Sequence, residues 1–325
     1  MRSVVVAGHV CVDFVPEIPV AAATEPGELL EVGPLAVAAG GCVANTGGDL
    51  AALGAEVQVV GDAGDDELGA LLVALLRARG AGTDQIRLRA GCSTSYSLVF
   101  EPGGQDRSFW HHVGANAEFD GSAVHLAGAG LLHVGYPSLL PALIADGGRP
   151  LEALLERARA AGLTTSLDLA VIDPASPAAR EDWPGLLRRV LPLVDVFSPS
   201  IDDVRTALHL DVSAEPSELR DLARRLLDLG PAIVMLTAGA AGLQLSTGDA
   251  ARLRTAGAVL AGRPEEVWSG QEHFTPPPPV EVRTTLAAGD AATAGLLYGL
   301  LAGLDARETL ELAARTAAER ISGAR

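Results

Sequence analysis

The chain has 325 residues and a formal net charge of −17, and its 24 basic residues are all arginine. This length can bury a large core, and it fits a single α/β domain with an appendage or two small domains. Binding a nucleic-acid backbone requires clustered cations, so the charge argues against a nucleic-acid partner. The lack of lysine excludes a P-loop lysine, a Schiff-base lysine and a protein-kinase strand lysine. Any phosphate chemistry must therefore rest on backbone amides, arginine and metal.

The sequence carries no membrane or secretory signature. No run of about 18 uncharged apolar residues bounded by loops occurs, and the first residues reach a strand and polar positions too soon for a signal peptide. We therefore expect a cytoplasmic protein with no membrane partner. Cys11, Cys42 and Cys92 are widely spaced and form no CxxC pair, which favours buried, reduced thiols.

The chain opens with an apolar run over residues 3–7, typical of a strand buried on both faces of a parallel sheet. The run ends in a polar segment that contains Asp13 but no GxGxxG fingerprint. Asp13 at the end of this strand is a candidate ligand contact, and a turn-forming aspartate is the alternative.

Two segments on either side of the first helical unit predict a small group of strands with a hairpin. Their alternating pieces cover residues 29–32, 35–37, 95–100 and 107–111. They do not continue the main sheet, so we expect a separate β lid. The predicted lid comprises residues 14–39 and 92–113, and the main α/β domain comprises residues 1–13, 40–91 and 114–325.

Between the lid segments, Gly40 and Gly41 open a helix predicted to reach about Leu53. The glycines allow close approach of a ligand, and Asn45 can donate to and accept from a hydroxyl. A strand over 57–60, a tight acidic turn over 61–69 and a helix over 68–79 follow. The turn is expected to be solvated rather than a calcium site, because its spacing differs from an EF-hand loop.

After residue 114, strands alternate regularly with helices. Strands are predicted over 131–134, 164–169, 194–197 and 232–237, and helices over 151–161, 183–191, 201–208 and 217–229. This order predicts an α/β fold with a doubly wound, mostly parallel sheet flanked by helices. Ligands of such sheets collect beyond the carboxyl ends of the strands, where the polar residues are Asp13, Asp168, Ser200 to Asp203, and Thr237 to Gly239. Residues 243–245 read as an antiparallel edge, and residues 256–279 are the least regular part.

The last motif is a glycine turn that opens a helix predicted from Asp290 to about Gly303. Backbone N–H groups at a helix start lack intrahelical partners and can hold an anion. A carboxylate there is suited to taking a proton from a hydroxyl that attacks phosphorus. The residues alone leave two roles open for Asp290, a helix cap or a general base.

Three stretches together resemble the ribokinase-like (PfkB) family of carbohydrate kinases. They are Gly40-Gly41 with Asn45 and the glycines and acids of 61–69, Thr237-x-Gly239 after a buried strand, and Ala287-Ala288-Gly289-Asp290. Their order covers nearly the whole chain. The resemblance implies a ribokinase-like domain with a small β lid that often forms a homodimer contact. It also implies transfer of phosphate from ATP, with Mg²⁺, to a hydroxyl of a sugar or nucleoside.

The resemblance assigns roles to individual residues. Asp290 corresponds to the general base, and the backbone of Ala287, Ala288 and Gly289 to its anion hole. Substrate contacts are implied for Asp13, Gly41 and Asn45, nucleotide contacts for Thr237, Gly239 and Ser200, and a metal contact for Asp203. Ser200 and Asp203 stand where the family has Asn-x-x-Glu, so the acid is shorter and the amide is lost.

One departure concerns ions. The family motif commonly begins with an aspartate associated with a monovalent cation, and this chain has Thr284 there. The sequence therefore favours an altered ion requirement. The leading hypothesis is a Mg·ATP-dependent sugar or polyol kinase, and the alternatives are a nucleoside kinase and a catalytically weak sugar or nucleotide binder. Retention of Asp290 in its Ala-Ala-Gly turn favours chemistry.

Overall fold

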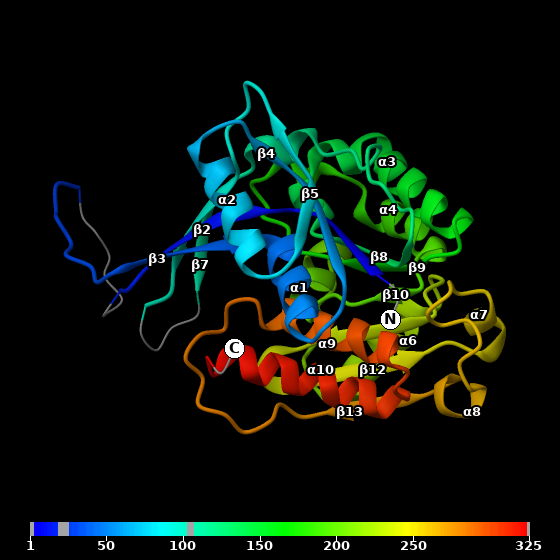
Figure 1. Ribbon diagram of the computed structural model, residues 1–325. Coiled ribbons are helices and arrows are strands. Elements are labelled where there is room, and N and C mark those ends of the chain that lie inside the picture. Colours follow the sequence, from blue (N-terminus) through cyan, green and yellow to red (C-terminus); the bar gives the residue numbers. More distant parts are fainter. Residues whose placement is uncertain (1–2, 19–25, 103–106, 324–325) are drawn as a thin grey trace.

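The computed structural model describes residues 3–18, 26–102 and 107–323. Its centre is a nine-stranded sheet in the order β13-β12-β11-β10-β9-β8-β1-β4-β5 (Figure 1). Strands β11 to β5 of this order are parallel, and β12 pairs antiparallel with β11 and β13. In spatial order the strands are Glu272–Thr275, Leu243–Thr247, Ile233–Thr237, Val196–Phe197, Thr164–Asp168, Ala129–Gly135, Ser3–Gly8, Val57–Gly64 and Gly82–Arg89.

Helices cover both faces of this sheet (Figure 1). They are α1 Gly41–Ala52, α2 Glu67–Ala78, α3 Pro141–Ala160, α4 Trp183–Val190, α5 Ile201–Leu208, α6 Pro216–Leu227, α7 Ala250–Arg254, α8 Glu265–Trp268, α9 Ala288–Ala302 and α10 Ala306–Ile321. In β1, Val4 and Val6 pack into the core on one face, and Val5 and Ala7 into the core on the other. Successive side chains of a strand point to opposite faces, so a continuous apolar strand needs two cores. The doubly wound α/β prediction is confirmed.

A separate four-stranded sheet has the order β3-β2-β6-β7 and projects from one side of the main body (Figure 1). Its strands are β3 Leu35–Gly40, β2 Cys11–Pro16, β6 Tyr96–Phe100 and β7 Ser108–His112. Asp13 lies in β2, so its predicted place at the end of the first strand was wrong. Residues 29–32 form no strand, whereas the hairpin of β6 and β7 agrees with the prediction. The exact lid boundaries stay a prediction.

The register of the small sheet separates a polar row from an apolar face. Asp13 pairs with Ser97, and Ser97 pairs with His111, so these three side chains share one face. The opposite face carries apolar residues that are mutually aligned across the strands, namely Phe14, Leu98, Trp110, Val37 and Leu35.

The acidic segment 61–69 differs from its prediction. Strand β4 continues through Gly64, and Asp62 is fully buried instead of lying in a solvated turn. Arg87 and Arg89 of β5 donate four hydrogen bonds of 2.7 to 3.1 Å to its carboxylate. Asp66 and Glu67 behave as expected of helix N-terminal acids, because Asp66 caps α2 through the Gly69 N–H and exposed Glu67 lies in the first turn.

Other differences concern element boundaries. Helix α3 begins before the predicted residue 151, and residues Ala145 to Gly148 interrupt its helical backbone. Strand β5 and helix α10 were not predicted, and the irregular segment 256–279 contains α8 and β13. Within the described residues, Cys11, Cys42 and Cys92 are free thiols, and Cys11 and Cys42 are buried as expected, whereas Cys92 is half-buried. No described helix has the length and apolar character needed to cross a membrane.

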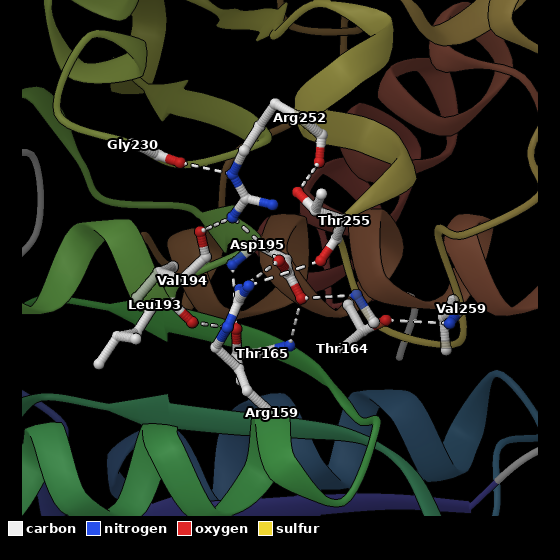
Figure 2. A network of polar contacts seen from close by, with 11 residues as sticks. Arg159, Thr164, Thr165, Leu193, Val194, Asp195, Gly230, Arg252, Thr255 and Val259 are labelled. Carbon is white, nitrogen blue, oxygen red and sulfur yellow. Dashed lines mark hydrogen bonds and ion pairs between the residues drawn. The ribbon is translucent and has the colours of Figure 1, made fainter.

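A buried aspartate joins the amino ends of three central strands. Asp195 precedes β10 and is fully buried, and its carboxylate accepts from the Thr165 and Gly257 backbone N–H groups at 3.1 and 3.0 Å. Arg159 and Arg252 donate to its other oxygen at 3.2 and 3.0 Å, as Figure 2 shows. This network connects α3, β9, β10 and the segment after α7 at the end of the sheet opposite Asp168 and Thr237.

Candidate active site

The predicted base lies at the start of α9. Asp290 is 2 % exposed, and its carboxylate accepts hydrogen bonds from three side chains. Tyr136, after β8, donates to Oδ2 at 2.7 Å. Asn45 and Thr46 lie on α1 and donate at 3.1 Å, Asn45 to the same oxygen and Thr46 to Oδ1. Residues from two distant parts of the chain, α1 and the end of β8, therefore orient this carboxylate.

Asp290 has a raised pKa. Burial is the main cause, because it disfavours the charged form, and the hydrogen bonds from Tyr136, Thr46 and Asn45 oppose it. A carboxylate with a raised pKa holds a proton more readily than an exposed one. This property suits a group that removes a proton from an alcohol near neutral pH.

The turn before Asp290 has the backbone geometry of an anion site. Ala287 is the N-cap of α9 with φ 61°, and no side chain caps the first turn. Positive φ is unfavourable for alanine and persists only where the surroundings hold it. The Ala288 N–H donates to the Thr285 carbonyl at 3.4 Å, and the N–H groups of Gly289 and Asp290 that follow it are available to a ligand. Thr237, at the end of β11, lies beside this turn, since its hydroxyl is 3.9 Å from where a Cβ on Gly289 would lie.

The polar row of the small sheet faces the same region. Asp13 is 6 % exposed, and burial raises its pKa, opposed by hydrogen bonds from Cys11 and Ser97. His111 Nδ1 lies 3.1 Å from Ser97 Oγ, and its Nε2 lies 3.3 Å from Nε2 of His9, after β1. Burial is the main reason that the pKa of both histidines is lowered, and it lowers the pKa of His111 to about 4. Both rings are thus neutral near pH 7 and can each donate and accept one hydrogen bond.

The glycine pair at the start of α1 has a packing reason. A Cβ at Gly40 would collide with the Asp13 carboxylate, and one at Gly41 would lie 2.6 Å from His9 Nδ1. Gly41 also has φ +81°, which favours glycine. Asn45 lies one turn further. Arg79 donates to its side-chain oxygen at 3.4 Å, which directs its side-chain NH₂ group toward Asp290.

Two further acids lie in the same electrostatic environment as Asp290. Burial, followed by the charges of Asp203 and Asp290, raises the pKa of Asp168 well above its ordinary value. Burial raises the pKa of Asp203 to about 6. Asp203 and Ser200 form a capping box at α5, with reciprocal hydrogen bonds of 2.8 and 3.1 Å.

These acids fit a metal only as part of its ligand set. Within residues 3–18, 26–102 and 107–323, no group of three His, Cys, Asp or Glu side chains could hold a metal ion. Mg²⁺ in phosphate-transfer sites is usually bound by one or two carboxylates together with phosphates and water. The buried oxygens of Asp203 and Asp168 are compatible with that mode.

The structure brings the predicted residues together in two groups. Ala287 to Asp290 lie beside Thr237, and Thr237 pairs with Ser200 through an isolated bridge. Asp13, in β2 of the small sheet, lies against Gly40, and Gly41 lies against His9. Gly239 begins a short 3-10 helix after Thr237 and is exposed.

Sequence reasoning missed several residues of the site, namely Thr46, Tyr136, His9, Ser97 and His111. Tyr136 lies two residues after the strand predicted over 131–134, so its place beyond a strand end was an available signal. The contact between His9 and His111 depends on the parallel pairing of β2 with β6, which local sequence does not specify.

Comparisons with known proteins agree with this architecture. A sequence model described as pfkB family carbohydrate kinase matches residues 1–324. A protein of Archaeoglobus fulgidus described as an uncharacterized sugar kinase is 26 % identical over 262 residues, covering 80 % of this chain and 88 % of that protein.

Solved structures are similar in fold. A ribokinase of Arabidopsis thaliana complexed with ribose and ATP has a TM-score of 0.70 at 19 % identity, covering 98 % of this chain and 92 % of that chain. A nucleoside kinase of Burkholderia thailandensis in complex with inosine has a TM-score of 0.69 at 17 % identity, covering 98 % and 91 %. The chain therefore belongs to the pfkB family of carbohydrate kinases, phosphotransferases whose acceptor is an alcohol group.

Proposed function

We propose that the protein transfers the terminal phosphoryl group of ATP to a hydroxyl of a sugar or related small polyol, with Asp290 as general base. The observation that carries this proposal is the position of Asp290. Its buried carboxylate, with a raised pKa, lies in the same helical turn as the N–H groups that follow Ala287. A proton acceptor and a set of anion-binding donors are thus joined in one rigid element.

The other roles follow the two groups of residues. The backbone of Ala287, Ala288 and Gly289 would stabilise charge on the phosphoryl group. Asp13 and Gly41 would contact the acceptor, and Asn45 would help through its hydrogen bond to Asp290. We also propose that Thr237, Gly239 and Ser200 contact the nucleotide and that Asp203 contacts Mg²⁺.

When bound, Mg²⁺ would neutralise charge on the nucleotide phosphates. The chain itself offers oxygen ligands in Asp203 and Asp168, and it has no lysine for this purpose. Thr284 replaces the carboxylate that the family motif associates with a monovalent cation. We therefore propose that turnover depends on Mg²⁺ and responds weakly to added potassium.

The charges around the site favour a neutral acceptor. Asp13, Asp168 and Asp290 are all buried there, so a phosphorylated or carboxylated substrate would meet like charge. Hydroxyls can instead donate to these carboxylates and exchange hydrogen bonds with the neutral imidazoles. A sugar or polyol without an acidic group satisfies both conditions.

A nucleoside is the second candidate, because an aromatic side chain shares the face of the polar row. Phe109 pairs with Val99, which places it on the side of Asp13 and His111, and it is 45 % exposed. An exposed ring there could stack on a base.

A panel of acceptors tests these proposals. ADP release is measured with neutral sugars, polyols, nucleosides, sugar phosphates and sugar acids at saturating Mg·ATP. We expect turnover with a neutral sugar or polyol. Preference for a nucleoside would select the second candidate, and preference for an acidic sugar would contradict the charge argument alone. Tight binding of a sugar without any ADP release would make the protein a binder.

The pH dependence of turnover should identify the base. Because Asp290 must be ionised to accept a proton, kcat/KM should fall as the pH drops through its raised pKa. Tyr136→Phe removes a hydrogen bond that lowers this pKa, so the acidic limb should move to higher pH. The measurement is a pH–rate profile between about pH 5 and 9. Tyr298→Phe, in the middle of α9, is the control. If Tyr136→Phe left the acidic limb in place, that limb would belong to another group, such as Asp203.

We also propose a homodimer formed through the lid. The apolar face opposite the polar row exposes Trp110 by 67 %, Leu35 by 55 % and Val37 by 37 %. A contiguous exposed apolar sheet face marks a protein contact, and pairing with a second copy would bury the same face on both chains.

Light scattering after size exclusion tests the dimer. Wild type should have twice the chain mass of 33.2 kDa, and Trp110→Asp should shift it to the monomer. Leu88→Asp, on exposed β5, places the same charge away from this face and should leave the mass unchanged. A monomeric wild type at about 10 μM, on the order of ordinary dimer affinities, would contradict the proposal.

A further inference from the structure

The lid hairpin contacts the segment that leads into the Ala287 turn. Glu101 follows β6, and its carboxylate accepts from the Thr284 hydroxyl at 3.0 and 3.1 Å and from the Thr285 backbone N–H at 3.0 Å. On the other arm of the hairpin, Arg107 Nη1 donates to the Thr285 hydroxyl at 2.5 Å. Both arms therefore bind Thr285, and Glu101 also binds Thr284.

The main domain holds the other side of this segment. The Arg283 and Thr284 N–H groups donate to the Ile321 carbonyl at the end of α10, at 2.8 and 3.3 Å. The Thr284 hydroxyl also accepts from the Leu286 N–H at 3.1 Å. The segment is thus fixed between α10 and the lid, and a movement of the hairpin would release the lid side.

Thr285 transmits this contact to the start of α9. Its N–H is bound by Glu101, and its carbonyl accepts from the Ala288 N–H at 3.4 Å. Ala287, which lies between Thr285 and Ala288, has the unfavourable φ of 61°. Such a conformation needs external support, and a peptide held on both sides supplies it.

We propose that Glu101 is a positioning residue for phosphoryl transfer. It holds Thr284 and Thr285 so that the turn from Ala287 to Asp290 keeps its geometry while the lid lies over the site. This inference rests on the proposed function. The same hairpin carries His111, which contacts His9 beside the acceptor residues, so one element organises both sides of the reaction.

A threonine at position 284 fits this contact. Its hydroxyl donates to the Glu101 carboxylate, whereas the aspartate common in the family would place two carboxylates against each other. Thr284→Asp should therefore be more harmful than Thr284→Val. Adding Glu101→Gln should restore part of the loss, because the glutamine amide can donate to the new carboxylate.

Steady-state kinetics with the best acceptor of the panel test the proposal. Glu101→Ala and Thr284→Val should each lower kcat by roughly 10- to 100-fold, since small misplacements of reacting groups have effects of that order. The KM of the acceptor should change by less than about threefold, because the acceptor contacts stay in place. The double variant should be about as slow as Glu101→Ala, because both substitutions remove the hydrogen bond between Thr284 and Glu101. Glu31→Gln, an exposed glutamate between β2 and β3, is the matched control and should behave as wild type.

Hydrogen exchange gives a readout independent of turnover. The Thr285 and Ala288 amides should exchange faster in Glu101→Ala than in wild type, while amides in the middle of α9 should not change. Unchanged exchange at Thr285, an unchanged kcat, strictly additive variants or failure of the Thr284→Asp rescue would overturn the proposal. These outcomes differ from failure of the proposed function, in which wild type shows no turnover with any acceptor.

Discussion

Replacing Asp290 with asparagine is expected to lower kcat by about 10²- to 10⁴-fold, the range attributed to a general base. Asparagine keeps the size of the side chain but cannot take a proton from the attacking hydroxyl. The neighbours can adapt, because the Tyr136 and Thr46 hydroxyls are able to accept as well as donate. We therefore expect the loss to be confined to catalysis.

The experiment compares ADP release, ATP binding and thermal unfolding of the two proteins. ATP affinity should change by less than about threefold, because the role proposed for Asp290 is toward the acceptor and uniform binding energy is retained. Asp221→Asn, an exposed aspartate on α6, removes the same charge far from the site and should retain full activity. If Asp290→Asn kept a third or more of the wild-type kcat, the base would have to be another group.

The fold was largely predictable because its signals are local. The alternation of apolar strands with amphipathic helices between residues 131 and 237 reports burial directly, and parallel βαβ units follow from it. Strand β5 gave a weaker signal, since Ile86 and Leu88 are the only large apolar residues of GTDQIRLR, and its position depends on long-range contacts. Its Arg87 and Arg89 neutralise buried Asp62, whose charge in the sequence suggested a solvated turn.

The site was predictable only where the backbone determines it. The glycine turn before Asp290 shows in the sequence because an anion site at a helix start requires small residues. The orientation of its carboxylate depends on Tyr136 and Asn45, which lie 154 and 245 positions away. Likewise, the substitution at Thr284 suggested only a lost carboxylate, and the carboxylate of Glu101 at that position comes from the lid.

Replacing Asp195 with alanine should have the largest effect on stability. The variant would leave Arg159 and Arg252 without their shared carboxylate, and two backbone N–H groups without an acceptor (Figure 2). Removing one partner of a buried ion pair costs about 3–5 kcal/mol in the free energy of unfolding. For a chain of this size, that corresponds to a Tm lower by about 4–7 °C.

Differential scanning calorimetry and kinetics below the transition separate this effect from catalysis. The network lies at the amino ends of β9, β10 and β11, whereas the proposed catalytic group lies beyond their carboxyl ends, so the kcat of folded Asp195→Ala should be close to wild type. Asp202→Ala is the matched control, because its ion pair with Arg205 is exposed and should contribute less than about 1 kcal/mol. Equal Tm values for the two variants would show that Asp195 contributes no more to the stability of the protein than a surface carboxylate does. A Tm loss confined to Asp195→Ala, with kcat retained, would show that stability and chemistry are built at opposite ends of the same strands.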